Sequence, residues 1–203
     1  MKKTSNEFEH KYWPKSIIGI DEAGRGPIAG PLVVAGVILP TYYENDDIYD
    51  SKGLSEKKRL QLFELIKEVS LEYEILIVSP KIIDEINILQ ATKNAMFEIG
   101  SLLNSEIVLT DAVDINIKNK TVFPIIKGDQ KSISIAAASI LAKVTRDKIM
   151  EEYDVMYPGY GFKNNKGYPT KQHIEALKKL GILEIHRKTF NPVSKYNQLE
   201  LDL

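Results

Sequence analysis

The segment from Ile17 to Leu39, IIGIDEAGRGPIAGPLVVAGVIL, constrains the fold more than any other part of the chain. Two runs rich in Ile, Val and Leu, residues 17–20 and 32–39, flank a loop with the sequence GRGPIAGP. Such runs around a Gly- and Pro-containing loop are typical of two strands joined as a hairpin. Asp21 and Glu22 directly follow the first strand, where an unpaired carboxylate near the core would be costly. The pattern therefore predicts a hairpin that presents two acids for a chemical purpose.

Strand and helix patterns alternate along the rest of the chain. A serine cap at Ser55 precedes apolar residues at helical spacing, and a second helical pattern begins at Pro80 with Leu89 on its inward face. The expected strands are residues 73–78, 107–109 and 121–126, and the expected helices are residues 55–70, 80–103, 132–156 and 174–182. This alternation predicts an α/β fold.

The composition changes near residue 155, where the sequence becomes the glycine-, lysine- and tyrosine-rich YPGYGFKNNKGYPTKQH. We therefore expect one domain over residues 15–155, a C-terminal region over residues 156–196, and a tail over residues 197–203. The charge is also uneven. Residues 1–119 carry 13 basic and 19 acidic side chains, whereas residues 120–195 carry 14 basic and 7 acidic ones. This asymmetry is compatible with an acidic catalytic part and a basic part that holds the substrate.

The chain contains no cysteine, which excludes a disulfide framework, a thiolate metal site and thiol catalysis. The first residues, MKKTSNEFEHKYWPKS, lack the apolar stretch of a signal peptide. No window approaches the roughly 18 apolar residues of a membrane span. We expect a cytoplasmic protein with no membrane partner.

Acids recur where an apolar strand meets a loop. Asp111 follows IVLT and Asp129 follows IIKG, as Asp21 follows IIGI. Metal-ion catalysis of phosphodiester cleavage requires this pattern, because paired Mg²⁺ ions prefer carboxylate oxygens held rigidly. The alternative is that these acids are turn residues.

Six motifs resemble bacterial ribonuclease HII, in the order of that family and over most of the chain. They are IDEAGRGPIAGP, DSKGL from Asp50, KGD from Lys127, SIAAASILAKVTRD from Ser134, YGFKNNKGYPTKQH from Tyr160 and HRKTFNPV from His186.

The resemblance implies a ribonuclease H-like mixed sheet flanked by helices, with a small C-terminal helical region that contacts the substrate. It implies cleavage of the RNA strand of RNA-DNA hybrids, and cutting 5′ of ribonucleotides embedded in duplex DNA. Two-metal-ion hydrolysis with Mg²⁺ or Mn²⁺ would leave a 3′-hydroxyl and a 5′-phosphate. The implied roles are ribonucleotide removal from DNA and degradation of RNA primers.

In the resemblance, the catalytic and metal-binding carboxylates are Asp21, Glu22, Asp111 and Asp129. Asp114 is a rival for the third position, and we prefer Asp111 because it directly follows the apolar strand. Asp147 is expected to stabilise a helix rather than to bind metal. Gly53 departs from the more usual DSKKL form of the second motif.

The resemblance also implies how the substrate is held. Gly24, Arg25 and Gly26 would recognise the ribose 2′-hydroxyl largely through backbone groups, which glycine allows to approach closely. Tyr168 would stack on the nucleotide after the ribose. Further expected contacts to backbone phosphates come from Lys52, Asn87, Ser139, Lys143 and Arg146.

The remaining histidines and the tail have weaker patterns. His10, His173 and His186 are not expected to form a ligand cluster, and His186 is expected to order the C-terminal segment. The final residues, QLELDL, resemble the short peptides with which bacterial replication and repair proteins bind the sliding clamp. The docking residues would be Gln198, Leu199, Leu201 and Leu203, and the alternative is that the leucines pack on the protein itself. We expect a monomer.

Three other functions compete with a ribonuclease. A relative with the same fold would act on another nucleic acid, such as a DNA junction or only a plain RNA-DNA hybrid. A silent module would bind nucleic acid without cutting it, which four intact carboxylates argue against. A metabolite enzyme would hold a phosphate in the GRG loop, but that arrangement requires a helix after the loop, whereas GPLVVAGVIL predicts a strand.

Overall fold

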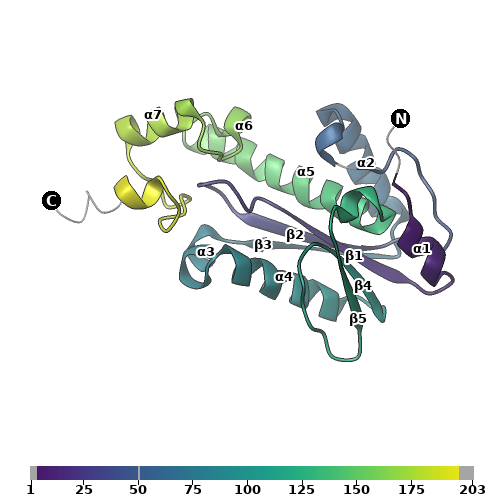
Figure 1. Ribbon diagram of the computed structural model, residues 1–203. Helices are drawn as coiled ribbons and strands as arrows, with labels where there is room; N and C mark the ends of the chain where they lie inside the picture. Colours follow the sequence, from purple (N-terminus) through teal and green to yellow (C-terminus); the bar gives the residue numbers. More distant parts are fainter. Residues whose placement is uncertain (1–3, 50, 197–203) are drawn as a thin grey trace. The chain divides into compact units, whose positions relative to one another are not determined.

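The computed structural model describes residues 4–49 and 51–196, except for the side chain of Lys52 (Figure 1). The chain divides into two compact units. Unit 1 comprises Met1–Ala23, Val33–Leu76 and Thr92–Val144, and unit 2 comprises Gly24–Leu32, Ile77–Ala91 and Thr145–Leu203. The expected division near residue 155 follows the chain linearly, whereas these two units alternate along it.

A mixed sheet of five strands, counted over the described residues, forms the centre of unit 1 and has the order β3-β2-β1-β4-β5. Strand β1 pairs with β2 in antiparallel register and with β4 in parallel register, and β4 pairs with β5 in parallel. The predicted hairpin is therefore confirmed. The strands are β1 (Ile17–Ala23), β2 (Leu32–Ile38), β3 (Glu72–Val78), β4 (Ile107–Asp111) and β5 (Thr121–Ile125).

The expected helices agree with the structure except between Pro80 and Leu103, and the short helices α1 and α6 were not expected. Asn87 has a φ of 63°, which breaks the expected single helix into α3 and α4. The break changes the helical phase, so the prediction that Leu89 faces inward was wrong, and 49% of this residue is exposed. The helices are α1 (Glu7–Tyr12), α2 (Glu56–Val69), α3 (Pro80–Ile86), α4 (Ile88–Leu102), α5 (Ile133–Met156), α6 (Phe162–Asn165) and α7 (Lys171–Leu180), with 3₁₀ turns η1 (Ser51–Gly53) and η2 (Gly128–Gln130).

Helices α5 and α4 cover opposite faces of the sheet (Figure 1). A Cβ on Gly19 of β1 would lie 2.1 Å from the backbone carbon of Ser134 in α5. A Cβ on Gly36 of β2, which points to the other face, would lie 2.3 Å from the Ile99 side chain in α4. Both helices therefore approach the sheet backbone closely, which explains why glycines interrupt two otherwise apolar strands. Strand β1 is held from both sides up to Asp21.

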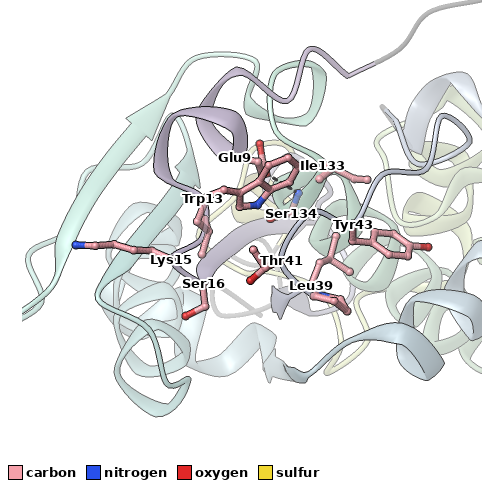
Figure 2. Close-up of a pocket in the computed structure, with 11 residues that line it drawn as sticks. Glu9, Trp13, Lys15, Ser16, Leu39, Thr41, Tyr43, Ile133 and Ser134 are labelled. Atoms are coloured by element: carbon pink, nitrogen blue, oxygen red, sulfur yellow. Dashed lines mark hydrogen bonds between the residues drawn. The ribbon is translucent and has the colours of Figure 1, made fainter.

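Helix α1, which the sequence pattern did not predict, supplies a cap for α5. The Glu9 carboxylate accepts hydrogen bonds from the Ser132 hydroxyl at 2.6 Å and from the Ser134 backbone N–H at 3.1 Å. Figure 2 shows Glu9 and Ser134 together at the lining of a small pocket. A carboxylate at a helix N-terminus stabilises the unpaired N–H groups there, so α1 fixes the start of the longest described helix.

Unit 2 has a core of its own. Ile28, Met150, Phe162, Leu177 and Val193 are among the buried side chains that pack together there. This core draws on the loop after β1, the second half of α5 and the C-terminal segments. None of the helices in the described ranges has the length and apolar character needed to cross a lipid bilayer.

Candidate active site

Asp111 is the last residue of β4, and Asp21 lies beside that end within the adjacent parallel strand β1. The register pairs Ile20 of β1 with Thr110 of β4, so the next residue of each strand is an aspartate. Because parallel strands point in the same direction, both carboxylates emerge at one edge of the sheet. Glu22 follows Asp21 within β1.

The electrostatics of Asp21 show that these acids are close to one another. Burial raises the pKa of Asp21 well above its ordinary value, and the negative charges of Glu22 and then Asp111 raise it further. Hydrogen bonds from the Ser139 hydroxyl and from the Glu22 backbone N–H, at 2.7 Å, act in the opposite direction. The site therefore concentrates negative charge where little water is present to screen it.

Asp129 lies in the turn η2, beside Asp111. The backbone N–H of Gly128 donates to Asp111 Oδ1 at 2.9 Å, and Asp129 is buried. Lys127 enters the turn with a left-handed backbone, and a Cβ on Gly128 would lie 2.6 Å from Ile135 of α5. The KGD motif thus bends the chain tightly enough to bring its acid to the edge where β4 ends.

Asp114, the rival third acid, is exposed. It is not among the charges that raise the pKa of Asp21, whereas Asp111 is. The positions support Asp111 over Asp114. We refer to Asp21, Glu22, Asp111 and Asp129 as the carboxylate edge.

The donor chemistry of the carboxylate edge fits a hard divalent cation. Its oxygens are of the type that Mg²⁺ and Mn²⁺ prefer, and a cation would offset the repulsion that raises the pKa of Asp21. Among residues 4–49 and 51–196, no three His, Cys, Asp or Glu side chains already stand in the geometry of a metal site. The assignment of metal ligands therefore stays a prediction that rests on donor type and strand-end placement.

Ser139 supports Asp21 from α5. Its hydroxyl lies 3.0 Å from that of Ser51 in η1, and both residues are buried. Ser51 belongs to the DSKGL motif, so this motif reaches the carboxylate edge through two hydroxyl groups. Ser139 is thus placed beside the Asp21 carboxylate, while its expected phosphate contact stays a prediction.

The other expected phosphate contacts are placed differently. Asn87 is exposed, and its Oδ1 accepts from the Gln90 backbone N–H, which caps the start of α4. Lys143 is partly buried in α5. Lys52 belongs to η1, and its side chain lies outside the described part of the chain.

In unit 2, two arginines hold the loop from Gly24 to Pro31, which we call the GRG loop. Arg187 donates to the carbonyl oxygens of Gly24 at 2.6 Å, Arg25 at 3.0 Å and Gly30 at 3.0 Å. Sequence reasoning missed Arg187, although it lies in the HRKTFNPV motif. Its side chain is fully buried, so its role is to fix the course of this loop.

Arg146 holds the other end of the same loop. Its guanidinium donates to the carbonyl oxygens of Ala29, Pro31 and Lys166 at 2.9–3.1 Å, and the residue is only 2% exposed. The expectation that Arg146 contacts a phosphate is therefore corrected, because its donors are already bound to backbone carbonyls in the interior. A buried cation needs such acceptors, and a sequence cannot show that they are present.

Burial lowers the pKa values of both guanidinium groups. The pKa of Arg146 falls to about 10, and that of Arg187 falls to about 9 through burial and then the charge of Arg146. Both values lie above neutral pH, so both side chains remain charged. Unit 2 thus contains two buried positive charges under the GRG loop.

Tyr168 lies against this loop. A Cβ on Gly26 would be 3.4 Å from Cε1 of the Tyr168 ring, and 48% of Tyr168 is exposed. Gly24 has a φ of 101°, and a Cβ there would lie 2.2 Å from Nε of Arg146. The structure therefore brings together the GRG motif and Tyr168, although 142 positions separate Gly26 from Tyr168, and it leaves about half of Tyr168 exposed.

The chain was compared with known proteins. The model of the Ribonuclease HII family matches residues 18–193. The chain is 56% identical over 177 residues to Ribonuclease HII of Ruminiclostridium cellulolyticum, covering 86% of this chain and 69% of that relative.

Two solved structures share the fold. The crystal structure of ribonuclease H2 from Pyrococcus horikoshii matches with a TM-score of 0.80 and 27% identity, over 93% of this chain and all of that one. The RNase HII in the PCNA:RNase HII complex from Archaeoglobus fulgidus matches with a TM-score of 0.75 and 32% identity, over 87% of this chain and 95% of that one. The ribonuclease H-like fold predicted from the motifs is confirmed.

Proposed function

Because this chain belongs to the ribonuclease HII family, we propose that it is an endonuclease that cleaves the RNA strand of RNA-DNA hybrids and cuts 5′ of ribonucleotides embedded in duplex DNA. The products would be a 3′-hydroxyl and a 5′-phosphate. The observation that carries this proposal is the carboxylate edge, where parallel strands bring Asp21 and Asp111 to one place.

The carboxylate edge would hold two divalent cations, Mg²⁺ or Mn²⁺, through Asp21, Glu22, Asp111 and Asp129. Bound there, such ions supply Lewis-acid polarisation of the phosphate and a lowered pKa for the attacking water. The chain's own contribution is to keep the carboxylates ionised and oriented. The Ser139 hydroxyl favours the ionised form of Asp21, and the Gly128 N–H orients Asp111.

The GRG loop and Tyr168 would supply substrate recognition. Arg187 and Arg146 bind five different carbonyl groups of residues 24–31, which directs these acceptors into the protein. The backbone N–H groups of Gly24, Arg25 and Gly26 are then the loop's main means of binding a 2′-hydroxyl. Tyr168, half-exposed beside Gly26, would stack on the adjoining nucleotide.

The rival functions have less support. A phosphate cradle would need a helix after the GRG loop, and β2 follows it instead. A silent binding module would have no need for carboxylates whose burial and mutual repulsion destabilise the fold. The biological roles that follow are removal of ribonucleotides from DNA and degradation of RNA primers.

A second partner is proposed through the tail. Gln198, Leu199, Leu201 and Leu203 lie outside the described residues. A protein of similar fold occurs in a complex with PCNA, which supports a sliding clamp as the partner here. Binding of the bacterial clamp to the full chain should be lost in Gln198→Ala, and unchanged binding would exclude this tail as the docking peptide.

The test is cleavage of a labelled DNA duplex carrying one ribonucleotide, with Mg²⁺, beside an RNA-DNA hybrid and a DNA-only duplex. We expect one cut 5′ of the ribonucleotide, cutting of the hybrid and none of the plain DNA. Asp21→Asn, Asp111→Asn and Asp129→Asn should each abolish cutting, whereas the matched control Asp114→Asn should retain it. If the well-folded protein binds these duplexes but cuts none with Mg²⁺ or Mn²⁺, it is a binding module.

A further inference from the structure

Two buried histidines that the proposed function does not use lie behind Tyr168. His173 of α7 and His186 are 0% and 1% exposed, and their Nε2 atoms are 3.0 Å apart. No local sequence pattern predicts this contact, because the two histidines are 13 positions apart in the chain. Each imidazole also has a second hydrogen bond through Nδ1.

The partners of the two Nδ1 atoms determine where the protons are. His173 Nδ1 is 2.9 Å from the carbonyl oxygen of Tyr168, which can only accept, so this nitrogen carries a proton. His186 Nδ1 accepts from the Leu183 backbone N–H at 2.9 Å, so this nitrogen carries none. A neutral imidazole has one N–H, so the proton of His186 is on Nε2, and His173 Nε2 is the acceptor.

The four groups therefore form one directional chain of hydrogen bonds. It runs from the Leu183 N–H to His186, from His186 Nε2–H to His173 Nε2, and from His173 Nδ1–H to the Tyr168 carbonyl. Protonation of His173 would place two Nε2–H groups against each other across 3.0 Å, and protonation of His186 would place its Nδ1–H against the Leu183 N–H across 2.9 Å. This chain of hydrogen bonds therefore has one consistent proton arrangement, in which both imidazoles are neutral.

The surroundings favour the neutral forms. The His173 ring packs edge-on against Phe162, with centroids 5.2 Å apart, and the rings of Tyr160 and Phe162 also contact His186. Burial lowers the pKa of His173, and burial with the neighbouring imidazole lowers that of His186 to about 4. Both rings are thus neutral at physiological pH.

The chain of hydrogen bonds ends at the backbone carbonyl of Tyr168. The Tyr168 carbonyl accepts from both His173 Nδ1 and the Thr170 N–H, at 2.8 Å, while the Tyr168 N–H donates to the Asn165 carbonyl. The other end connects to the GRG loop, because Ala29 and His186 form an antiparallel bridge. Both substrate-binding elements of unit 2 are therefore attached to the imidazole pair.

We infer that His173 and His186 are positioning residues, which through this fixed pair of tautomers hold the backbone of Tyr168 so that its ring stays against Gly26 in place for a nucleotide. The functional part of this inference rests on the proposed function, in which Tyr168 stacks on the substrate. The tautomers can be tested without it.

The first experiment is long-range ¹H–¹⁵N correlation NMR of the imidazoles in the full chain at neutral pH. The chain has three histidines, and His10→Asn, His173→Asn and His186→Asn each remove one signal for assignment. We expect His173 as the Nδ1–H tautomer and His186 as the Nε2–H tautomer. The inferred chain of hydrogen bonds would be overturned by the reverse pattern of tautomers or by a charged ring. It would also be overturned by two Nε2 atoms without a proton, as a shared metal ion would require.

The second experiment separates positioning from general structure. His173→Gln retains a polar group near Nε2 but loses the bond to Tyr168, whereas His173→Asn retains a donor near Nδ1. We expect His173→Gln to raise KM for the ribonucleotide-containing duplex about tenfold with little change in kcat, and His173→Asn to raise it much less. In a Tyr168→Ala background, the added effect of His173→Gln should disappear.

The outcomes distinguish the two proposals. An undiminished His173→Gln effect in the Tyr168→Ala background, or equal effects of Gln and Asn, would mean that His173 does not act through Tyr168. If no ribonucleotide substrate is cut at all, the proposed function fails, while the NMR result still decides whether the imidazole pair has the inferred tautomers.

Discussion

At the carboxylate edge of unit 1, regular strands bring like charges together, whereas in unit 2 two buried arginines hold an irregular loop by its carbonyl groups. Asp21 is destabilised where it stands, since burial and the charges of Glu22 and Asp111 all disfavour its ionised form. Burial also disfavours the charge of Arg187 and lowers its pKa, but its guanidinium is surrounded by carbonyl acceptors. The carboxylate edge thus lowers the stability of the fold at the place where we propose catalysis. The two arginines stabilise the loop that we propose recognises the substrate. Substitutions at the carboxylate edge should therefore lower activity more than stability, and substitutions of the buried arginines should lower stability more than activity.

The largest expected effect is on activity, at the carboxylate edge. Asp21→Asn should lower kcat for the single-ribonucleotide duplex by about a thousandfold or more, because under the proposed function it removes a metal-binding carboxylate. The same change removes a buried, repelled charge, so the melting temperature should stay the same or rise. Single-turnover cleavage and calorimetry on one preparation measure both, and a marked loss of stability would contradict this account of Asp21.

The next effect is on stability, at the GRG loop. Arg187→Met leaves the carbonyls of Gly24, Arg25 and Gly30 without their buried donor, and we expect a loss of about 3–5 kcal/mol in the free energy of unfolding. Urea denaturation measures it. The exposed neighbour variant Lys188→Met is the control and should change stability by less than about 0.5 kcal/mol. Equal stabilities of the two variants would show that Arg187 is not a structural centre of unit 2.

Two glycines of the same motif sharpen the comparison. Gly24→Ala should cost about 1–3 kcal/mol, because φ is 101° and the new Cβ would meet Arg146. Gly26→Ala meets only the edge of Tyr168 at 3.4 Å, so stability should change little. If Gly26 allows close approach of the ribose, Gly26→Ala should raise KM for the ribonucleotide substrate although it leaves stability nearly unchanged. Denaturation curves and cleavage kinetics of the pair test this, and a reversed order of stabilities would refute it.

The last effect appears only when the pH is lowered. The folded pKa of His186 is lowered to about 4 from an ordinary 6.5, so the folded state binds fewer protons than the unfolded state between these values. Its contribution to stability is therefore complete above about pH 6.5 and is lost as the pH falls toward 4, by about 2 kcal/mol between pH 7 and pH 5. In His186→Asn this part of the pH dependence should be absent. Identical pH profiles of the two proteins would contradict a buried neutral His186.

The sequence was informative where function depends on local order. The alternation of apolar strands and turns predicted the hairpin, and an acid directly after each strand predicted Asp21, Asp111 and Asp129 as a group. The register of β1 with β4 agrees with that prediction for Asp21 and Asp111, because it pairs Ile20 with Thr110 and an aspartate follows each of them. The sequence left Asp111 and Asp114 as alternatives, and the bend at η2 favours Asp111.

The sequence was misleading or silent where a side chain's partners are distant in the chain. Arg146 fits a phosphate contact in the VTRD motif, yet its acceptors at Pro31 and Ala29 are 115 and 117 residues away. Arg187 has acceptors more than 150 residues away. A basic side chain has the same local pattern whether it ends in solvent or in the interior, because only the tertiary structure determines if carbonyl groups surround it.

By itself, then, the sequence determined the fold class, the hairpin and the acids at strand ends, because strand periodicity and turn chemistry are local properties of the chain. Only the tertiary structure decided which polar side chains are buried. For this reason Ser51, Arg187 and the pair of His173 and His186 were identified from the structure and not from the sequence. Their hydrogen bonds join segments that are distant in sequence, and the cost of burying an unsatisfied polar group makes those long-range partners specific.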